Sequence, residues 1–201
     1  MARYCPGMMR GLLGLLLMGV TFLASCALRS EITLRSVENG ATLRPAIILA
    51  AFVSSDASTA DVFLTDLSRD DLDAGVDIRT ITGQITHIRL FLVPRPGSTP
   101  IESTASTMTL RHAVLARGEM GVFAGGGFMD PDTDLGSEEF RSGVSGATLT
   151  LSGATPGFAD RLGASRLSGT IVAPRDAALA HLIEQRLGDV LDAIGSTRQR
   201  R

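Results

Sequence analysis

The chain has 201 residues and a formal net charge of −2, and 44% of its residues are hydrophobic while only 4% are aromatic. This mild acidity gives no electrostatic basis for nucleic acid binding, which depends on clustered positive charge. The few aromatic side chains supply little surface for stacking sugars or bases. All 19 residues counted as lysine or arginine are arginine, which we interpret as codon bias from a GC-rich genome.

The first 25 residues have the parts of an export signal. Arg3 and Arg10 give a positive start, and residues 11–23 form an uncharged, mostly apolar run. This run is shorter than the ~20 residues of a membrane-spanning helix and suits the apolar region of a signal peptide. We therefore expect residues 1–25 to be removed on export. The alternatives are an ordinary secretory signal and a buried apolar helix.

The end of this segment, Leu23-Ala24-Ser25-Cys26, resembles the lipobox of bacterial lipoproteins. The resemblance implies a diacylglycerol thioether on Cys26, cleavage before it, and acylation of the new amino terminus by a fatty acid such as palmitate. Two or more acyl chains hold a protein firmly in a membrane. Ala27 stands where an aspartate would mark inner-membrane retention, so the resemblance favours the outer membrane, on its periplasmic face. Cys5 leaves with the signal, and the mature domain has no cysteine for a disulfide.

The chain after Cys26 contains many short strand patterns. Residues 31–37 alternate polar and apolar side chains, and an Asn39-Gly40 turn pair follows. The apolar run 46–53 is consistent with a central strand buried on both faces. About four residues separate Cys26 from the first strand, so we expect the domain to lie close to the bilayer. Further strands are predicted over residues 60–65, 84–93, 107–117, 119–129, 146–152 and 166–173.

The apolar period changes near the C-terminus. From Leu179 to Ile194, leucine, isoleucine and valine recur at spacings of three and four, which predicts an amphipathic helix over residues 174–194. Pro174 suits a helix start, and Asp176 would lie in the first turn. The tail 196–201 is polar and is expected to fray.

About eight strands and one helix predict a mainly β fold. We expect an antiparallel sandwich or a partly closed barrel with the C-terminal amphipathic helix packed on it. The domain would span residues 31–195 and follow a short lipidated anchor at residues 26–30.

An acidic loop is one candidate for a metal site. Asp130, Asp132 and Asp134 alternate along the chain, and alternate carboxylates in a loop can converge on Ca²⁺. The match to an EF-hand loop fails at Leu135 and Arg141, where that loop needs glycine and glutamate. A solvated turn is the alternative, and we expect no bound cofactor.

Two histidines are the other candidate for a metal site. His87 and His112 lie on neighbouring predicted strands, but two imidazoles make only half a zinc site, and an acid such as Asp61 or Asp130 would have to complete it. His112 facing the core is the alternative. The acidic segment 66–77 is interpreted as a solvated loop.

The sequence contains no recognised catalytic motif. It has no Gly-x-Ser-x-Gly elbow, and the triple glycine at 125–127 lacks the lysine of a phosphate-binding loop. We interpret these glycines as a bulge, a bend or a close backbone contact.

These features favour a membrane-anchored envelope lipoprotein that acts as a non-catalytic interaction or structural module. The expected partners are the membrane, through the lipid on Cys26, and another envelope protein. One alternative is a carrier of an apolar ligand inside the β-fold. The other is a metal-dependent hydrolase that uses His87 and His112.

Overall fold

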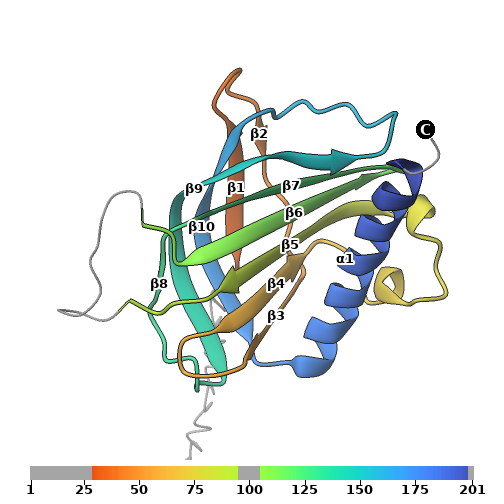
Figure 1. Ribbon diagram of the computed structural model, residues 1–201. Helices are drawn as coiled ribbons and strands as arrows, with labels where there is room; N and C mark the ends of the chain where they lie inside the picture. The colour runs from red at the N-terminus through yellow and green to blue at the C-terminus, as the bar shows by residue number, and fades with distance from the viewer. Residues whose placement is uncertain (1–28, 95–104, 199–201) are drawn as a thin grey trace, which may run out of the picture.

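The computed structural model describes residues 29–94 and 105–198. Cys26 and the segment before it lie outside these residues, so what the sequence predicts for them stays a prediction. The described chain is mainly β, as predicted, with antiparallel strands and one C-terminal helix (Figure 1). The strands are β1 (Glu31–Ser36), β2 (Thr42–Leu43), β3 (Leu49–Ser54), β4 (Ala60–Thr65), β5 (Thr82–Leu90), β6 (Met108–Ala116), β7 (Glu119–Gly127), β8 (Met129–Pro131), β9 (Glu139–Ala154) and β10 (Ser165–Pro174). The helices are η1 (Asp70–Leu72), η2 (Ile78–Thr80) and α1 (Ala177–Arg198).

All strands belong to one sheet, in the order β2-β1-β10-β9-β7-β6-β5-β4-β3, with β8 paired to β9. The sheet curls into a half-barrel, as Figure 1 shows. The curl brings the edge strand β3 to the end of β10, where Phe52 and Arg175 form a parallel bridge. The half-barrel is therefore pinned together at one point, beside the start of α1.

The interior of the half-barrel is filled by side chains. Inward-facing residues from opposite parts of the sheet form one buried cluster, because alternate strand residues point to the same face. Phe52, Phe123 and Phe140 are fully buried there, with Leu34 from the far side of the sheet. Burial of this apolar surface is the main source of stability for a domain without disulfides.

A second cluster lies on the outer face of the sheet. Helix α1 crosses β3, β4 and β5 there (Figure 1). Its apolar stripe, which includes Ile183, Leu187 and Val190, packs against Phe63 and Ile85. The apolar side of the helix that the sequence predicts is therefore the side that packs on the sheet.

The triple glycine on β7 reflects close backbone contact. A Cβ on Gly125 would collide with the carbonyl oxygen of Thr148 on β9. A Cβ on Gly127 would lie 2.8 Å from the Cβ of Ala147. The β7–β9 pair approaches too closely here for any other residue.

Three details differ from the sequence-based expectations. The apolar run at 46–53 supplies an edge strand, β3, and it is apolar because the helix covers one face and the barrel interior the other. Pro174 ends β10, and Asp176 caps α1 by accepting a hydrogen bond from the Leu179 backbone N–H at 2.9 Å. Helix α1 continues to Arg198, so the start of the predicted frayed tail is helical.

The two candidate functional sites

His87 and His112 lie on opposite faces of the sheet. His87 faces outward, with its Nε2 2.8 Å from an oxygen of Asp61 and its ring stacked on Phe63 at a centroid distance of 4.6 Å. His112 faces the barrel interior and is fully buried. The sheet backbone separates the two imidazoles, so they do not converge on a shared metal.

The surroundings of His112 keep its imidazole neutral. Burial lowers the pKa of His112 to about 4. Its Nδ1 lies 2.9 Å from the hydroxyl of Thr86, on the neighbouring strand. Its Nε2 is buried and has no hydrogen-bond partner among the described residues. His112 is therefore a polar group inside an apolar core.

Asp130 lies on β8, and Asp132 and Asp134 lie in the acidic loop that follows, which is held by Arg175. The guanidinium of Arg175 donates to the backbone oxygens of Ser137 and Leu135, and it stacks on the ring of Phe52 at 4.7 Å. In the two described ranges, no group of three or more histidine, cysteine, aspartate or glutamate side chains is placed to hold a metal ion.

A buried arginine holds the other acidic loop. Arg186 of α1 is 2% exposed and donates to the backbone oxygens of Asp71, Asp73 and Val76. Its guanidinium also pairs with Asp189 at 2.9 Å. The loop is thus fixed to α1 through its carbonyl groups. We call these hydrogen bonds the Arg186 clamp. The sequence contains one indication of it, because Arg186 interrupts the apolar stripe of the helix.

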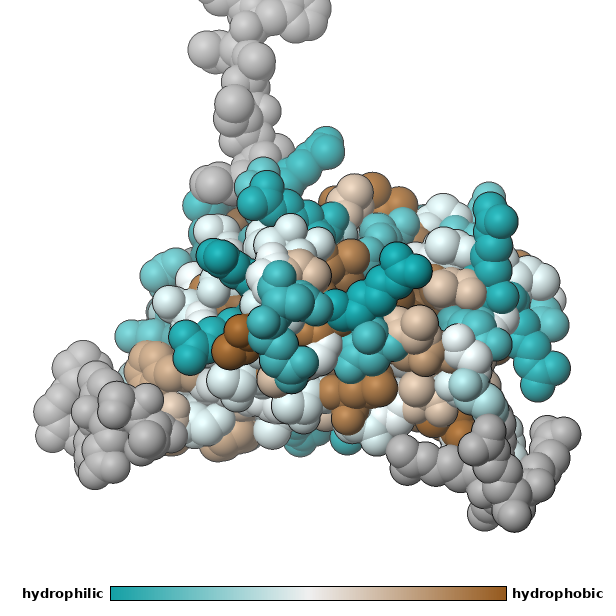
Figure 2. All heavy atoms as spheres, turned by 90° about the horizontal axis from the view of Figure 1, so that it is seen from above, coloured by the Kyte–Doolittle hydropathy of each residue, from teal (hydrophilic) through white to brown (hydrophobic). Residues whose placement is uncertain are grey.

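The first hollow lies at the end of the half-barrel that carries the β1–β2 turn. We call it the rim hollow; its volume is about 600 Å³. Figure 2 views the molecule from this end and shows brown hydrophobic side chains among teal hydrophilic ones. Its lining is mostly apolar, and the main residues are Leu43, Val114, Phe123, Phe158 and Leu162.

Polar groups lie directly beside the rim hollow. Gln84 is the cross-strand neighbour of Val114, and His112 is the neighbour of Phe123. The side-chain oxygen of Gln84 is buried without a hydrogen-bond partner in the described part of the chain. Gln84 donates through its backbone and its amide to the carboxylate of Asp66, and burial raises the pKa of Asp66. These polar atoms are buried behind the lining of the hollow, and the polar residues that line the hollow itself include Thr42, Glu119 and Arg161.

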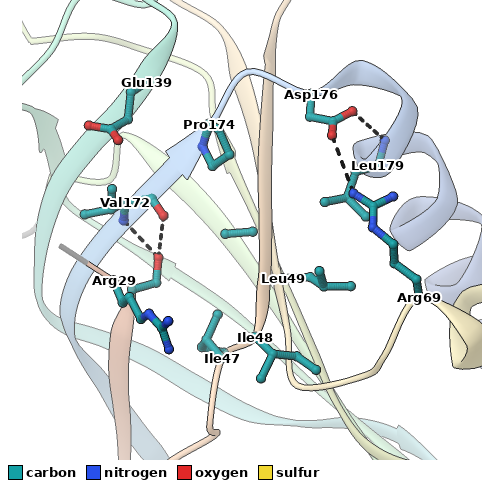
Figure 3. A pocket seen from close by; sticks show the side chains of 12 residues that line it. Arg29, Ile47, Ile48, Leu49, Arg69, Glu139, Val172, Pro174, Asp176 and Leu179 are labelled. Carbon is teal, nitrogen blue, oxygen red and sulfur yellow. Dashed lines mark hydrogen bonds and ion pairs between the residues drawn. The ribbon is translucent and has the colours of Figure 1, made fainter. Parts of the chain in front are cut away.

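The second hollow lies between β3 and β10, and we call it the seam cleft. Its volume is about 610 Å³. Figure 3 shows Ile47, Ile48 and Leu49 on one wall and Val172 on the strand opposite, with Arg29 beside them. The cleft exists because β3 meets β10 only at its far end. Loop residues line much of both hollows, so strand and helix periodicity could not indicate them.

No protein-family model, curated protein or solved structure shows significant similarity to this chain. No helix within residues 29–94 and 105–198 is long and apolar enough to cross a membrane. The function is therefore inferred from the residues and their geometry.

Proposed function

We propose that the chain is an envelope lipoprotein, held in a membrane by lipid on Cys26, whose β domain is a non-catalytic binding module. The observation that carries this proposal is the lipobox, Leu23 to Cys26, at the end of a complete signal segment. Cleavage before Cys26 would leave that cysteine as the first residue, and only Ala27 and Leu28 would separate it from the described domain.

The start of the domain supports a short, firm connection to the anchor. Ser30 is buried, and its hydroxyl donates to the backbone oxygen of Val172 at 2.8 Å and accepts from the Val172 N–H at 2.9 Å. The chain is thus fixed to β10 only four residues after Cys26, a distance of at most ~14 Å. The membrane is therefore the nearest partner of the module.

Metabolic labelling with palmitate tests the anchor. The wild-type protein should incorporate the label and run as the processed chain. Cys26→Ser should lose the label and stay unprocessed, because the thioether is the site of the first lipid. Ser25→Ala is the matched control, since it keeps a small side chain before the cleavage point. A wild-type protein without label, or a labelled Cys26→Ser variant, would contradict the proposal.

The rim hollow favours a second candidate function, a carrier of an apolar ligand. Small-molecule sites have volumes of about 300–1,000 Å³ and a mostly apolar lining with a few polar groups, and the rim hollow has a volume of about 600 Å³. The filled interior restricts such a ligand to this end of the half-barrel. A single hydrocarbon chain with a polar head would suit the apolar walls, with the head near Thr42, Glu119 and Arg161 in the lining.

A photoreactive fatty acid tests the carrier function on the full chain in its membrane. We expect crosslinks to map to residues 41–43 and to the segment 157–162, which contribute to the lining of the rim hollow. Val114→Gln should remove them, and Ile48→Gln, which changes the seam cleft, should not. Crosslinks that are spread evenly over the chain, or that persist in Val114→Gln, would rule this function out.

A further inference from the structure

The surface around the start of the described chain combines exposed isoleucine with arginine. Ile48 is 57% exposed, and Ile47 is half-buried beside it. Arg29 and Arg44 line the same groove as the two isoleucines. Figure 3 shows Arg29, Ile47 and Ile48 side by side at the seam cleft. We call these four residues the exit face, because the anchor segment joins the domain at Arg29.

The position of the exit face relative to the anchor is fixed by covalent geometry. Arg29 is the third residue after Cys26 in the sequence, so their Cα atoms lie within ~11 Å of each other. A lipidated Cys26 sits at the bilayer surface, and residues that border Arg29 therefore lie at or near the headgroups. The strand β1 leads away from this point, and Val37 lies after its far end, ~20 Å further on.

The side chains of the exit face have the chemistry of a membrane interface. Arginine can lay its apolar stem along hydrocarbon and keep its charge among the headgroups. Neither Arg29 nor Arg44 forms an ion pair with another described residue. Glu31 is the one carboxylate that lines their shared groove. The seam cleft, which Arg29, Ile47 and Ile48 also line, carries Glu139 and Asp176, and Asp176 is paired with Arg69. The guanidinium groups are thus free to meet phosphate oxygens, and Ile48 is free to enter the acyl boundary.

We propose that the exit face docks on the anionic headgroup region of the membrane that holds the lipid, and so fixes the orientation of the domain. This inference rests on the proposed lipidation of Cys26. Docking by this face directs the rim hollow away from the bilayer, because that hollow lies at the other end of β1. The partner is a lipid surface, recognised by two arginines around an exposed isoleucine.

Depth-dependent fluorescence quenching tests the orientation. Cys26 would carry its lipid on sulfur and Cys5 would be removed, so a single introduced cysteine is the only reactive thiol. Ile48→Cys and Val37→Cys are labelled with the same environment-sensitive dye in the lipidated protein. Val37 is the matched control because it is an exposed aliphatic residue, at 60% against 57% for Ile48. The vesicles contain phosphatidylethanolamine and phosphatidylglycerol with brominated acyl chains.

The proposal predicts quenching at position 48 at least about twofold stronger than at position 37, since Ile48 borders the start of β1 and Val37 follows its far end, ~20 Å further along the strand. Arg29→Glu with Arg44→Glu should remove most of that difference by repelling the anionic headgroups. Equal quenching at both positions, stronger quenching at 37, or no effect of the two charge reversals would overturn the docking. A protein that carries no lipid on Cys26 by mass would instead overturn the proposed anchor, so the two failures are distinguishable.

Discussion

His112 shows how a single buried residue can make stability depend on pH. In the folded protein the pKa of His112 is about 4, against 6.5 for a free histidine. Between these values the unfolded chain binds a proton at this residue and the folded chain does not. The free energy of unfolding therefore falls as the pH falls from 6.5 towards 4 and is unaffected by this group above 6.5. The full loss is about 3 kcal/mol.

The variant His112→Gln should lack this pH-dependent part of the free energy of unfolding, because glutamine stays neutral at every pH and can still form a hydrogen bond with Thr86. As the pH falls from 7 to 4, we expect the free energy of unfolding of the wild-type protein to fall by about 3 kcal/mol more than that of the variant. Urea unfolding at pH 7.0, 5.5 and 4.0 measures the difference. His181→Gln, on the exposed face of α1, is the control and should follow the wild type. Equal slopes for the wild type and His112→Gln would show that His112 titrates normally.

The close backbone contact at Gly125 leads to a second prediction about a single residue. A methyl group there has no room against the Thr148 carbonyl, so Gly125→Ala should lower the free energy of unfolding by about 2 kcal/mol or more. Gly143→Ala is the matched control, since a Cβ on that strand glycine meets nothing within 4 Å. Thermal unfolding of both variants checks the pair. Similar melting temperatures would mean that β7 and β9 are not in close contact.

At the scale of elements, the domain depends on clamps that join loops to strands and helices. Arg186 fixes three carbonyl groups of one loop to α1, and Arg175 fixes another loop to the junction of β10 and α1. Each clamp satisfies backbone oxygens that no strand or helix pairs, which is why a charged side chain is retained in a buried place at Arg186 and a half-buried one at Arg175.

Arg186→Met keeps much of the apolar stem but leaves these carbonyls without their donor. The expected cost is about 3 kcal/mol of stability, because buried carbonyl groups lose their hydrogen bonds. Residues 66–77 should also become sensitive to limited proteolysis. Arg166→Met, an exposed arginine on β10, should change neither property. A protease-resistant loop in Arg186→Met would show that the clamp does not hold it.

The elements themselves were largely predictable from the sequence, since alternation and turn residues are local signals. The strand at residues 60–65 was predicted with the bounds of β4. The sequence does not predict the first half of β9, from Glu139 to Ser145, because Ser142, Gly143 and Ser145 interrupt its apolar alternation. The edge position of β3 was also missed, since an apolar run reports burial and carries no information on strand order. The two hollows depend on how distant segments meet, and no local pattern records that.

At the scale of the whole molecule, the half-barrel has two distinct ends. Arg29 and the exit face lie at the end where the anchor joins, and the rim hollow lies at the end that carries the β1–β2 turn. A lipid on Cys26 would therefore hold one end at the bilayer and turn the other away from it. This arrangement suits a module that meets its ligand or partner protein away from the membrane while remaining firmly attached to it.

The most direct measurement of the central claim is the mass of the N-terminal peptide of the protein purified from its membrane. The proposal predicts that the chain begins at Cys26, and that this residue carries a diacylglycerol on sulfur and an acyl group on its amino terminus. A chain that begins at any other residue, or an unmodified Cys26, would contradict it.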